Sequence, residues 1–476
     1  MTYGRRRLAA WVAASLLGAA PAALAQSLAP SSGPVRPLTL GEALSRGLAN
    51  SQHLADMEAR TRAADAGVAA GTAAARPDLS LLGGYQRTNH VQPFAIALPG
   101  APAQVVYPDI PDNYRARLDL QWPIYTGGRT GALERAAAAE RGAAGKDLEA
   151  ARADLRLEIT RAYWALVTAR ETEAVLARSL DAIDAQVADL QTRLDQGLIP
   201  PNDLLSAQAQ QARQRGLAVE AGNTRATAEA DLRRLTGIDD PGALTPTDPL
   251  PEPMAGSGDV AHAPGMAGGS ASVAASGSAG QASNLPVSTM IARAMAQRPE
   301  RGALQDRTVS AVARRSAAAS TARPQVAVDA GYDYARPNPR IFPRREQWQT
   351  SWDLSVNLAW TLWDGGRRAA SEAEAAANAD AARARLADFD RQLAFDVRQR
   401  ANDLDSSRAV VTATEAEVKA AVEAERVVGE RYRAGVVTPT DVLEAQVARL
   451  QADLDRTRAL ANVRLAEARL ARALGR

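Results

Sequence analysis

The sequence contains no cysteine and few aromatic residues, and both absences limit what the protein can be. Without cysteine among its 476 residues, disulfides, thiolate metal sites, cysteine nucleophiles and an N-terminal lipid anchor on cysteine are excluded. Aromatic residues make up only 4% of the chain and alanine is abundant. This composition suits long, closely packed helices better than a bulky core, so we expect an extended molecule.

Long apolar runs are also missing beyond the N-terminus, which itself has the layout of a secretory signal peptide. Residues 5–7 are arginines, an apolar run fills 8–24, and Ala-Leu-Ala precedes Gln26. We predict a signal peptide over 1–25, for which the general export route is favoured over the twin-arginine route. No other stretch approaches the roughly 18 to 20 apolar residues of a spanning helix, which argues against an inner-membrane helical protein.

The chain has almost no net charge once the predicted signal peptide is set aside. The chain has 56 Lys+Arg, and removing the three signal arginines leaves 53 against 54 Asp+Glu, a mature net charge near −1. No basic patch indicates a nucleic-acid partner.

The sequence contains an internal repeat. The segment QWPIYTGGRTG returns as LAWTLWDGGRR, and QGLIPPNDLLSAQ returns as AGVVTPTDVLEAQ. Gly127 recurs as Gly365 and Gly197 as Gly435, in both cases 238 positions later. We therefore divide the mature chain into a first repeat at 26–240 and a second at 287–476. Residues 241–286 between them are rich in Gly, Ser and Pro and are expected to form a flexible segment.

Each repeat predicts three helices. An Ala-rich helix without internal proline is expected first, ending at Arg-Pro. A very long helix follows each Gly-Gly pair, roughly 100 Å at 1.5 Å per residue, and a turn then reverses the chain into a shorter helix. A heptad-like seam in the first long helix indicates a neighbouring helix: Leu176, Leu180, Ile183, Val187, Leu190 and Leu194. The predicted helix ranges are 39–75, 129–196 and 202–236, then 286–322, 367–434 and 440–474.

Two amphipathic strands are predicted between the first two helices of each repeat. Apolar and polar residues alternate through 114–125, 326–334 and 351–360, at about the length of a transmembrane barrel strand. One chain supplies only four such strands, too few to close, and an open edge in lipid leaves backbone groups unpaired. Oligomerisation is therefore expected.

The repeated order of elements resembles the TolC family of outer-membrane efflux and secretion proteins. The similarity rests on LTLGEAL (38–44), the Ala-Arg-Pro junctions, YTGGR and WDGGR, and the tips GLIPPNDLL and GVVTPTDVL. It implies a mainly α fold with a small β part, in which long antiparallel coiled-coil helices form an α-barrel. Four strands per protomer then join a 12-stranded transmembrane β-barrel shared by a homotrimer in outer-membrane lipid.

The resemblance also implies partners and tip residues. A periplasmic adaptor is expected to dock at the tips, and a proton-driven or ATP-driven inner-membrane pump to supply energy. The tip positions are Gly197, Leu198, Pro201, Gly435, Val436 and Pro439. Asp441 and Glu444 match acidic residues of the periplasmic entrance, and Tyr432 and Asp203 match a lock whose arginine is replaced here by Val437. Read from the residues alone, Thr438, Pro439 and Asp441 form a capped helix start.

Two other residue sets have competing interpretations. The pairs Gly127-Gly128 and Gly365-Gly366 lack the GK[ST] ending of a phosphate loop, which favours a bend from strand to helix. The indoles of Trp122, Trp360 and Trp363 fit either an interfacial aromatic girdle or ordinary core packing, and the girdle is favoured. The three histidines, at 53, 90 and 262, lie far apart in sequence, so we expect neither a metal nor a cofactor.

Three functional classes compete. Passive conduction through an outer-membrane channel accounts for both the strands and the helices. An exported coiled-coil spacer or envelope tether accounts for the heptads but not for four amphipathic strands. An exported hydrolase lacks a nucleophile with its base, so no enzymatic activity is expected.

Overall fold

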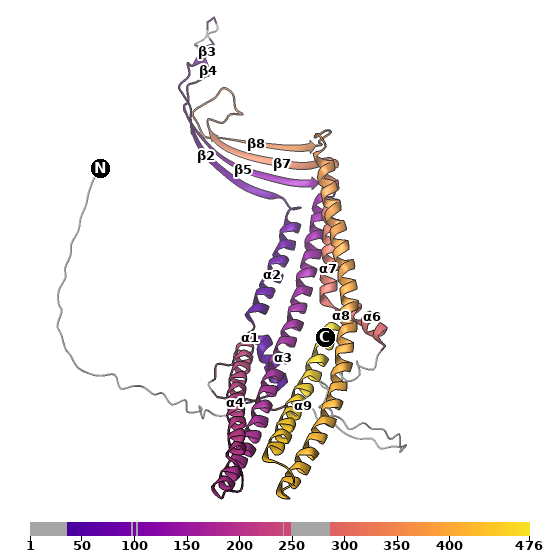
Figure 1. The fold of residues 1–476 in the computed structure, drawn as a ribbon. Coiled ribbons are helices and arrows are strands. Elements are labelled where there is room, and N and C mark those ends of the chain that lie inside the picture. Colours follow the sequence, from indigo (N-terminus) through magenta and orange to yellow (C-terminus); the bar gives the residue numbers. More distant parts are fainter. Residues whose placement is uncertain (1–35, 97–98, 101–102, 241, 249–285) are drawn as a thin grey trace, which may run out of the picture.

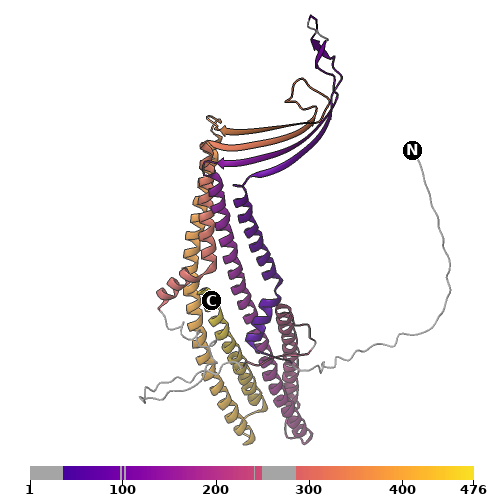
Figure 2. The ribbon, with the colours of Figure 1, turned by 180° about the vertical axis from the view of Figure 1, so that it is seen from behind.

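The molecule is a long helical rod with a curved four-stranded sheet at one end (Figure 1). The computed structural model describes residues 36–96, 99–100, 103–240, 242–248 and 286–476. The predicted signal peptide and most of the segment between the repeats lie outside the described residues. Seen from behind, the sheet bends away from the helix axis, and the helix tips lie at the opposite end (Figure 2).

The two long helices form the rod. Helices α3 (Arg129–Asp195) and α8 (Arg367–Arg433) have 67 residues each, which corresponds to roughly 100 Å. The chain then reverses into α4 (Pro201–Thr236) and α9 (Pro439–Ala473), which pack along the lower parts of α3 and α8. The predicted seam of α3 is confirmed near the tip, where Ile183 and Leu190 are buried against α4 and against Leu443 of α9.

The leading helix of each repeat is broken in two, whereas a single helix was expected. The first repeat has α1 (Leu40–Asn50) and α2 (Gln52–Ala73), and the second has α6 (Val287–Gln297) and α7 (Pro299–Ala319). Ser51 leaves the helical conformation and caps α2 by accepting a bond from the Leu54 amide at 3.3 Å. In the second repeat the expectation of no internal proline is wrong, because Pro299 forces Arg298 into an extended conformation.

The predicted alternating strands form one antiparallel sheet in the order β2-β5-β7-β8. Their bounds are β2 Asp78–Arg87, β5 Asp112–Tyr125, β7 Gln325–Arg336 and β8 Gln349–Ala359. A small hairpin of β3 (Phe94–Ile96) and β4 (Gln104–Tyr107) extends beyond the sheet between β2 and β5 (Figure 1). Within the described residues β2 and β8 each pair on one side only, so the sheet has two open edges.

One face of the sheet is apolar and uncovered. Trp352, Leu354, Val356 and Leu358 of β8 are 64–74% exposed, and Tyr332 of β7 is half exposed. A contiguous apolar patch of this kind marks a surface that is covered by lipid or by another protein. None of the described helices combines the length and the apolarity needed to cross a membrane.

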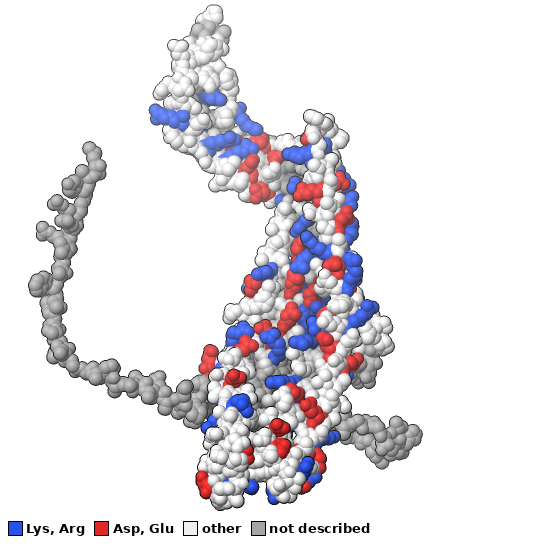
Figure 3. Space-filling view, viewed as in Figure 1, with Lys and Arg blue, Asp and Glu red and all other residues white. Residues whose placement is uncertain are grey.

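The two repeats build equivalent small cores around the long helices. Ile159, Leu166 and Leu232 are fully buried in the first repeat, and Val397, Leu404 and Leu470 fill the corresponding positions 238 residues later. Outside these cores Lys, Arg, Asp and Glu are interspersed along the rod on the face shown in Figure 3.

The segment between the repeats begins as an ordered strand, which corrects the expectation that all of it is flexible. Strand β6 (Leu244–Pro246) pairs in parallel with β1 (Arg36–Leu38), and Leu38 and Leu244 are fully buried. The buried Tyr163 hydroxyl donates to Asp248 at 2.8 Å, which fixes the end of this strand to α3. Apolar side chains directly after α4 therefore order residues 244–248, although the segment as a whole is rich in Gly and Ser.

Candidate functional site

Both helix tips are built as the same turn. Gly197 and Gly435 adopt φ values of +70° and +75°, a left-handed conformation that favours glycine at the end of a helix. The amides of Leu198 and Val436 then bond to the carbonyls of Arg193 and Arg431, each at 2.9 Å. The side chains of Leu198 and Val436 are 68% and 64% exposed, so each tip presents an apolar residue to solvent.

The second tip has a complete capping box. The Asp441 carboxylate accepts a bond from the Thr438 amide at 2.7 Å, while the Thr438 hydroxyl accepts one from the Asp441 amide at 3.4 Å. Pro439 occupies the first position of α9, as the capped-start interpretation predicts. The bonds from Thr438 lower the pKa of Asp441, so this exposed carboxyl is charged at neutral pH. Glu444 lies exposed one turn further along.

The first tip has a related acidic residue without the same cap. Pro200 precedes α4 and makes no side-chain capping bond, although Pro201 begins the helix as Pro439 does in α9. Asp203 is partly buried, and its carboxylate accepts a bond from the Asn202 side chain at 3.1 Å. The two tips thus share a backbone turn but use their aspartates differently.

Tyr432, on the last turn of α8, is placed between the two tips. Its hydroxyl is buried and makes no hydrogen bond to any described residue, so the expected bond to Asp203 is not formed in the single chain. The Arg193 guanidinium lies 4.9 Å from the centre of its ring, and Asp189 holds Arg193 through a 2.9 Å ion pair. Burial raises the pKa of Tyr432, which keeps the phenol neutral and able to donate.

Arg193 was not among the predicted tip residues. It stands on α3 between Leu190 and Leu194 of the predicted seam, so its position beside the partner helix was readable from the heptad spacing. The resemblance placed an arginine after α8, where this chain has Val437. The structure shows that the cation next to Tyr432 comes instead from the other long helix.

The Gly-Gly pairs make the bends from sheet to helix. Gly127 and Gly128 have φ values of +66° and +92°, and Gly365 and Gly366 have +69° and +91°. In both junctions the second glycine directly precedes a 67-residue helix. Both pairs thus lie where a strand turns into a helix, and a side chain at any of these four positions would be strained.

The tryptophans near these junctions are exposed. Trp122, Trp360 and Trp363 are 45%, 56% and 86% exposed, which is incompatible with ordinary core packing within the single chain. The Trp360 indole donates to the Ala322 carbonyl at 3.1 Å and so has a fixed orientation. An interfacial aromatic girdle stays a prediction for these three residues.

The histidines form no common site among the residues that the structure describes. His90 pairs with Asp109 at 2.7 Å in the loop region beyond the sheet, and His53 lies on α2. His262 lies outside the described residues. In the part of the chain that is described, no group of three or more His, Asp or Glu residues is arranged to hold a metal ion.

The fold joins a rod of long helices to an open amphipathic sheet, an architecture typical of a membrane channel with an extended tunnel. The model of the outer membrane efflux protein family matches residues 43–238 and 290–476, which fall within the two repeats. The chain therefore belongs to the outer membrane efflux protein family. It is an efflux channel-tunnel protein of the outer membrane with a periplasmic extension, and the coiled-coil spacer or tether is not favoured.

Solved structures support the fold. A membrane protein from Pseudomonas aeruginosa is similar with a TM-score of 0.75 at 21% identity, covering 92% of each chain. The outer membrane protein VceC from Vibrio cholerae has a TM-score of 0.71 at 19% identity over 92% of this chain and 96% of its own. The open-state outer membrane channel MtrE from Neisseria gonorrhoeae gives 0.71 at 16% identity, over 92% and 88%. No curated protein matches the chain.

Proposed function

We propose that three copies of the chain close into one passage that conducts solutes passively and catalyses no reaction. The observation that carries the proposal is the open four-stranded sheet with an uncovered apolar face. In lipid the unpaired edges of β2 and β8 cost several kcal/mol for each unsatisfied backbone group. Pairing between copies removes that cost, whereas folding of one chain alone does not.

The directions of the strands support this closure. All pairings in the order β2-β5-β7-β8 are antiparallel, so the two edge strands run in opposite directions. β8 of one copy can therefore pair antiparallel with β2 of the next, and the edge strands have similar lengths of 10 and 11 residues. Three copies give twelve strands, an even number within the range of bacterial outer-membrane barrels.

The helical rods continue the wall as a tunnel, and the tips provide its entrance. Exposed Leu198 and Val436 offer apolar contacts for the helical hairpin of a periplasmic adaptor. A proton-driven or ATP-driven inner-membrane pump supplies the energy and selects the cargo. Around a threefold axis Asp441 and Glu444 form a ring of negative charge that attracts cations and resists anions.

Tyr432 is proposed as part of the closed state. Its buried neutral hydroxyl lacks a partner in the single chain, and a buried unsatisfied donor costs about 1–3 kcal/mol. A small shift of the tip that brings Asp203 within hydrogen-bond distance recovers this cost. Opening then separates the two tips and breaks the bond.

The test is extraction of the protein from the outer membrane in detergent, followed by electrophoresis with and without heating. We expect a heat-modifiable, trimer-sized species that forms ion-conducting pores in planar bilayers. A monomer in the soluble periplasmic fraction would rule out the proposal. A trimer that forms no pores would contradict the proposed conduction but not the proposed assembly of three copies.

A further inference from the structure

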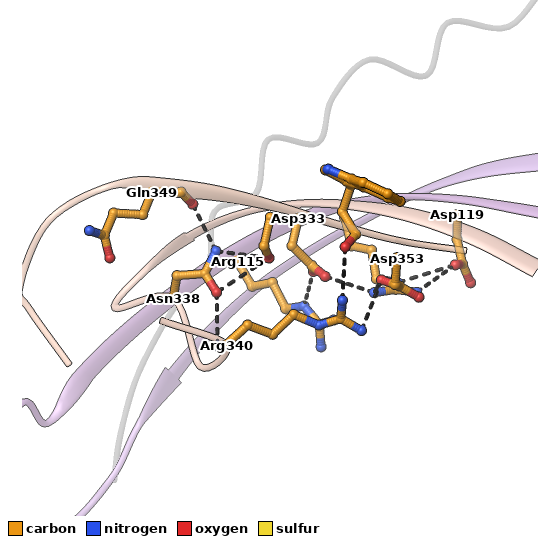
Figure 4. A network of polar contacts seen from close by, with 10 residues as sticks. Arg115, Asp119, Asp333, Asn338, Arg340, Gln349 and Asp353 are labelled. Atoms are coloured by element: carbon orange, nitrogen blue, oxygen red, sulfur yellow. Dashed lines mark hydrogen bonds and ion pairs between the residues drawn. The ribbon is translucent and has the colours of Figure 1, made fainter. Parts of the chain in front are cut away.

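A cluster of charged side chains occupies the face of the sheet opposite the apolar one (Figure 4). It joins three strands and the connection between β7 and β8. Its members are Arg115, Arg117 and Asp119 of β5, Asp333 of β7, Arg340 of the connection and Asp353 of β8. The three arginines and three aspartates balance in charge.

Arg117 is the centre of the cluster. Its guanidinium lies 2.7 Å from the Asp333 carboxylate, 3.1 Å from Asp353 and 3.0 Å from Asp119. The Arg117 side chain is 18% exposed and that of Asp333 only 4%. Arg115 and Arg340 contact the same carboxylates from the periphery, at 2.6 Å from Asp333 and 3.2 Å from Asp353. Within this cluster Arg117 is the arginine that contacts all three aspartates.

The backbone is shaped to let Arg117 reach this far. Asp353 is two strands away from β5, and Gly331 lies in register between Asp119 and Asp353. A Cβ atom on Gly331 would collide with the Arg117 guanidinium, so the arginine crosses β7 through the space that the missing side chain leaves. The Arg117 guanidinium thus connects three strands across a glycine, which distinguishes it from an isolated ion pair on a protein surface.

The location of the cluster follows from strand alternation. Leu118, Tyr332 and Trp352 neighbour the cluster in sequence, point to the opposite face and are 41%, 50% and 74% exposed. If that apolar face meets lipid, as the proposed function requires, the cluster faces the passage. Removing Arg117 would then leave the three carboxylates of the cluster with only Arg115 and Arg340 to compensate them.

We propose that Arg117 is a specificity-determining residue of the channel. It neutralises the three aspartates of the cluster, so that this part of the barrel wall neither concentrates cations nor repels anions. Uncompensated carboxylates lining a pore give cation preference, whereas a balanced wall does not. The inference rests on the proposed function, because the charge of this face affects permeation only if the face lines a passage.

The experiment measures reversal potentials of the full-length channel in planar bilayers under a KCl gradient. Wild type is compared with R117M, which removes the charge, and R117K, which keeps the charge but loses the fork. All variants are also made with Asp441→Ala and Glu444→Ala, so that the tip carboxylates do not mask the barrel wall. We expect a shift toward K⁺ in R117M and little change in R117K.

Two further variants test whether charge is the cause. The double variant R117M/D353N restores the balance, and its reversal potential is expected to return to the wild-type value. D353N alone leaves one positive charge in excess and is expected to shift the potential toward Cl⁻, which keeps the test decisive even if R117M does not assemble. An unmoved potential in R117M or D353N overturns the inference, as does an R117M shift that the double variant fails to reverse.

The control for the proposed function is the wild-type protein. If the wild type conducts and the variants have the same reversal potential, only the proposed role of Arg117 is excluded. A wild type that forms no pores removes the proposed function and this inference together.

Discussion

The substitution Leu354→Arg tests whether the uncovered face of the sheet lies in lipid. Leu354 is at the middle of β8, 64% exposed on the apolar face and in register with Ala330 of β7. An arginine on the lipid face of a barrel costs about 2–4 kcal/mol near the midplane, and the three copies of a trimer raise this to roughly 6–12 kcal/mol. We expect most of this variant to fail to assemble in the outer membrane.

Ser355→Arg is the matched control. Ser355 is the next residue of the same strand, on the opposite face, and stands in register with Asp329, so an arginine there gains a carboxylate partner. We expect this variant to assemble nearly as well as wild type. The assay is the amount of heat-modifiable trimer in isolated outer membranes and its melting temperature. Normal assembly of Leu354→Arg would refute the lipid-facing assignment, because an arginine at a water-exposed position costs almost nothing.

Three other predictions concern the tips. Replacing both Asp441 and Glu444 by alanine lowers the preference for K⁺ over Cl⁻ in planar bilayers if the acidic ring exists, and unchanged selectivity would exclude it. Tyr432→Phe increases the resting conductance if the hydroxyl closes onto Asp203, and an unchanged resting conductance would exclude this lock. Arg193→Gln removes the cation above the ring, and we expect more frequent opening in single-channel records; identical records would leave Arg193 without a role in the gate.

Much of the fold could be predicted because the sequence contains the same set of elements twice. The Gly-Gly pairs and the tips located the two long helices within about one residue of the observed bounds, and strict alternation located β5, β7 and β8 but not β2. The cap at Ser51 breaks an otherwise helical pattern. The break at Pro299 could be predicted from the sequence, because a proline disfavours the helical conformation of the residue before it. A side-chain cap or a proline ends a helix at one residue, even where the surrounding residues favour a helix.

The parts that could not be predicted depend on contacts between distant segments. No local pattern in residues 242–248 indicates a strand, and the strand forms because Leu244 is buried beside Leu38 while Asp248 meets Tyr163. At the tips, the ring of Tyr432 contacts Arg193 in the single chain, and the Tyr432 hydroxyl makes no bond to Asp203. Motif matching carries over residues that occupy equivalent positions and cannot detect a cation supplied from a different helix.

If three copies assemble as proposed, the repeat predicts how neighbouring copies meet. Within the chain the first junction contacts the residues just before β7. Arg323 donates to the Gly127 carbonyl at 3.1 Å, and a Cβ on Gly127 would lie 2.8 Å from the Ser320 carbonyl oxygen. At the second junction a Cβ on Gly365 would have no neighbour within 4 Å among the described residues. Arg76 is the counterpart of Arg323 in the first repeat, and it is exposed. Arg76 of a neighbouring copy can therefore donate to the Gly365 carbonyl, as Arg323 donates to that of Gly127. A trimer in which Arg76 remains in solvent would contradict this arrangement.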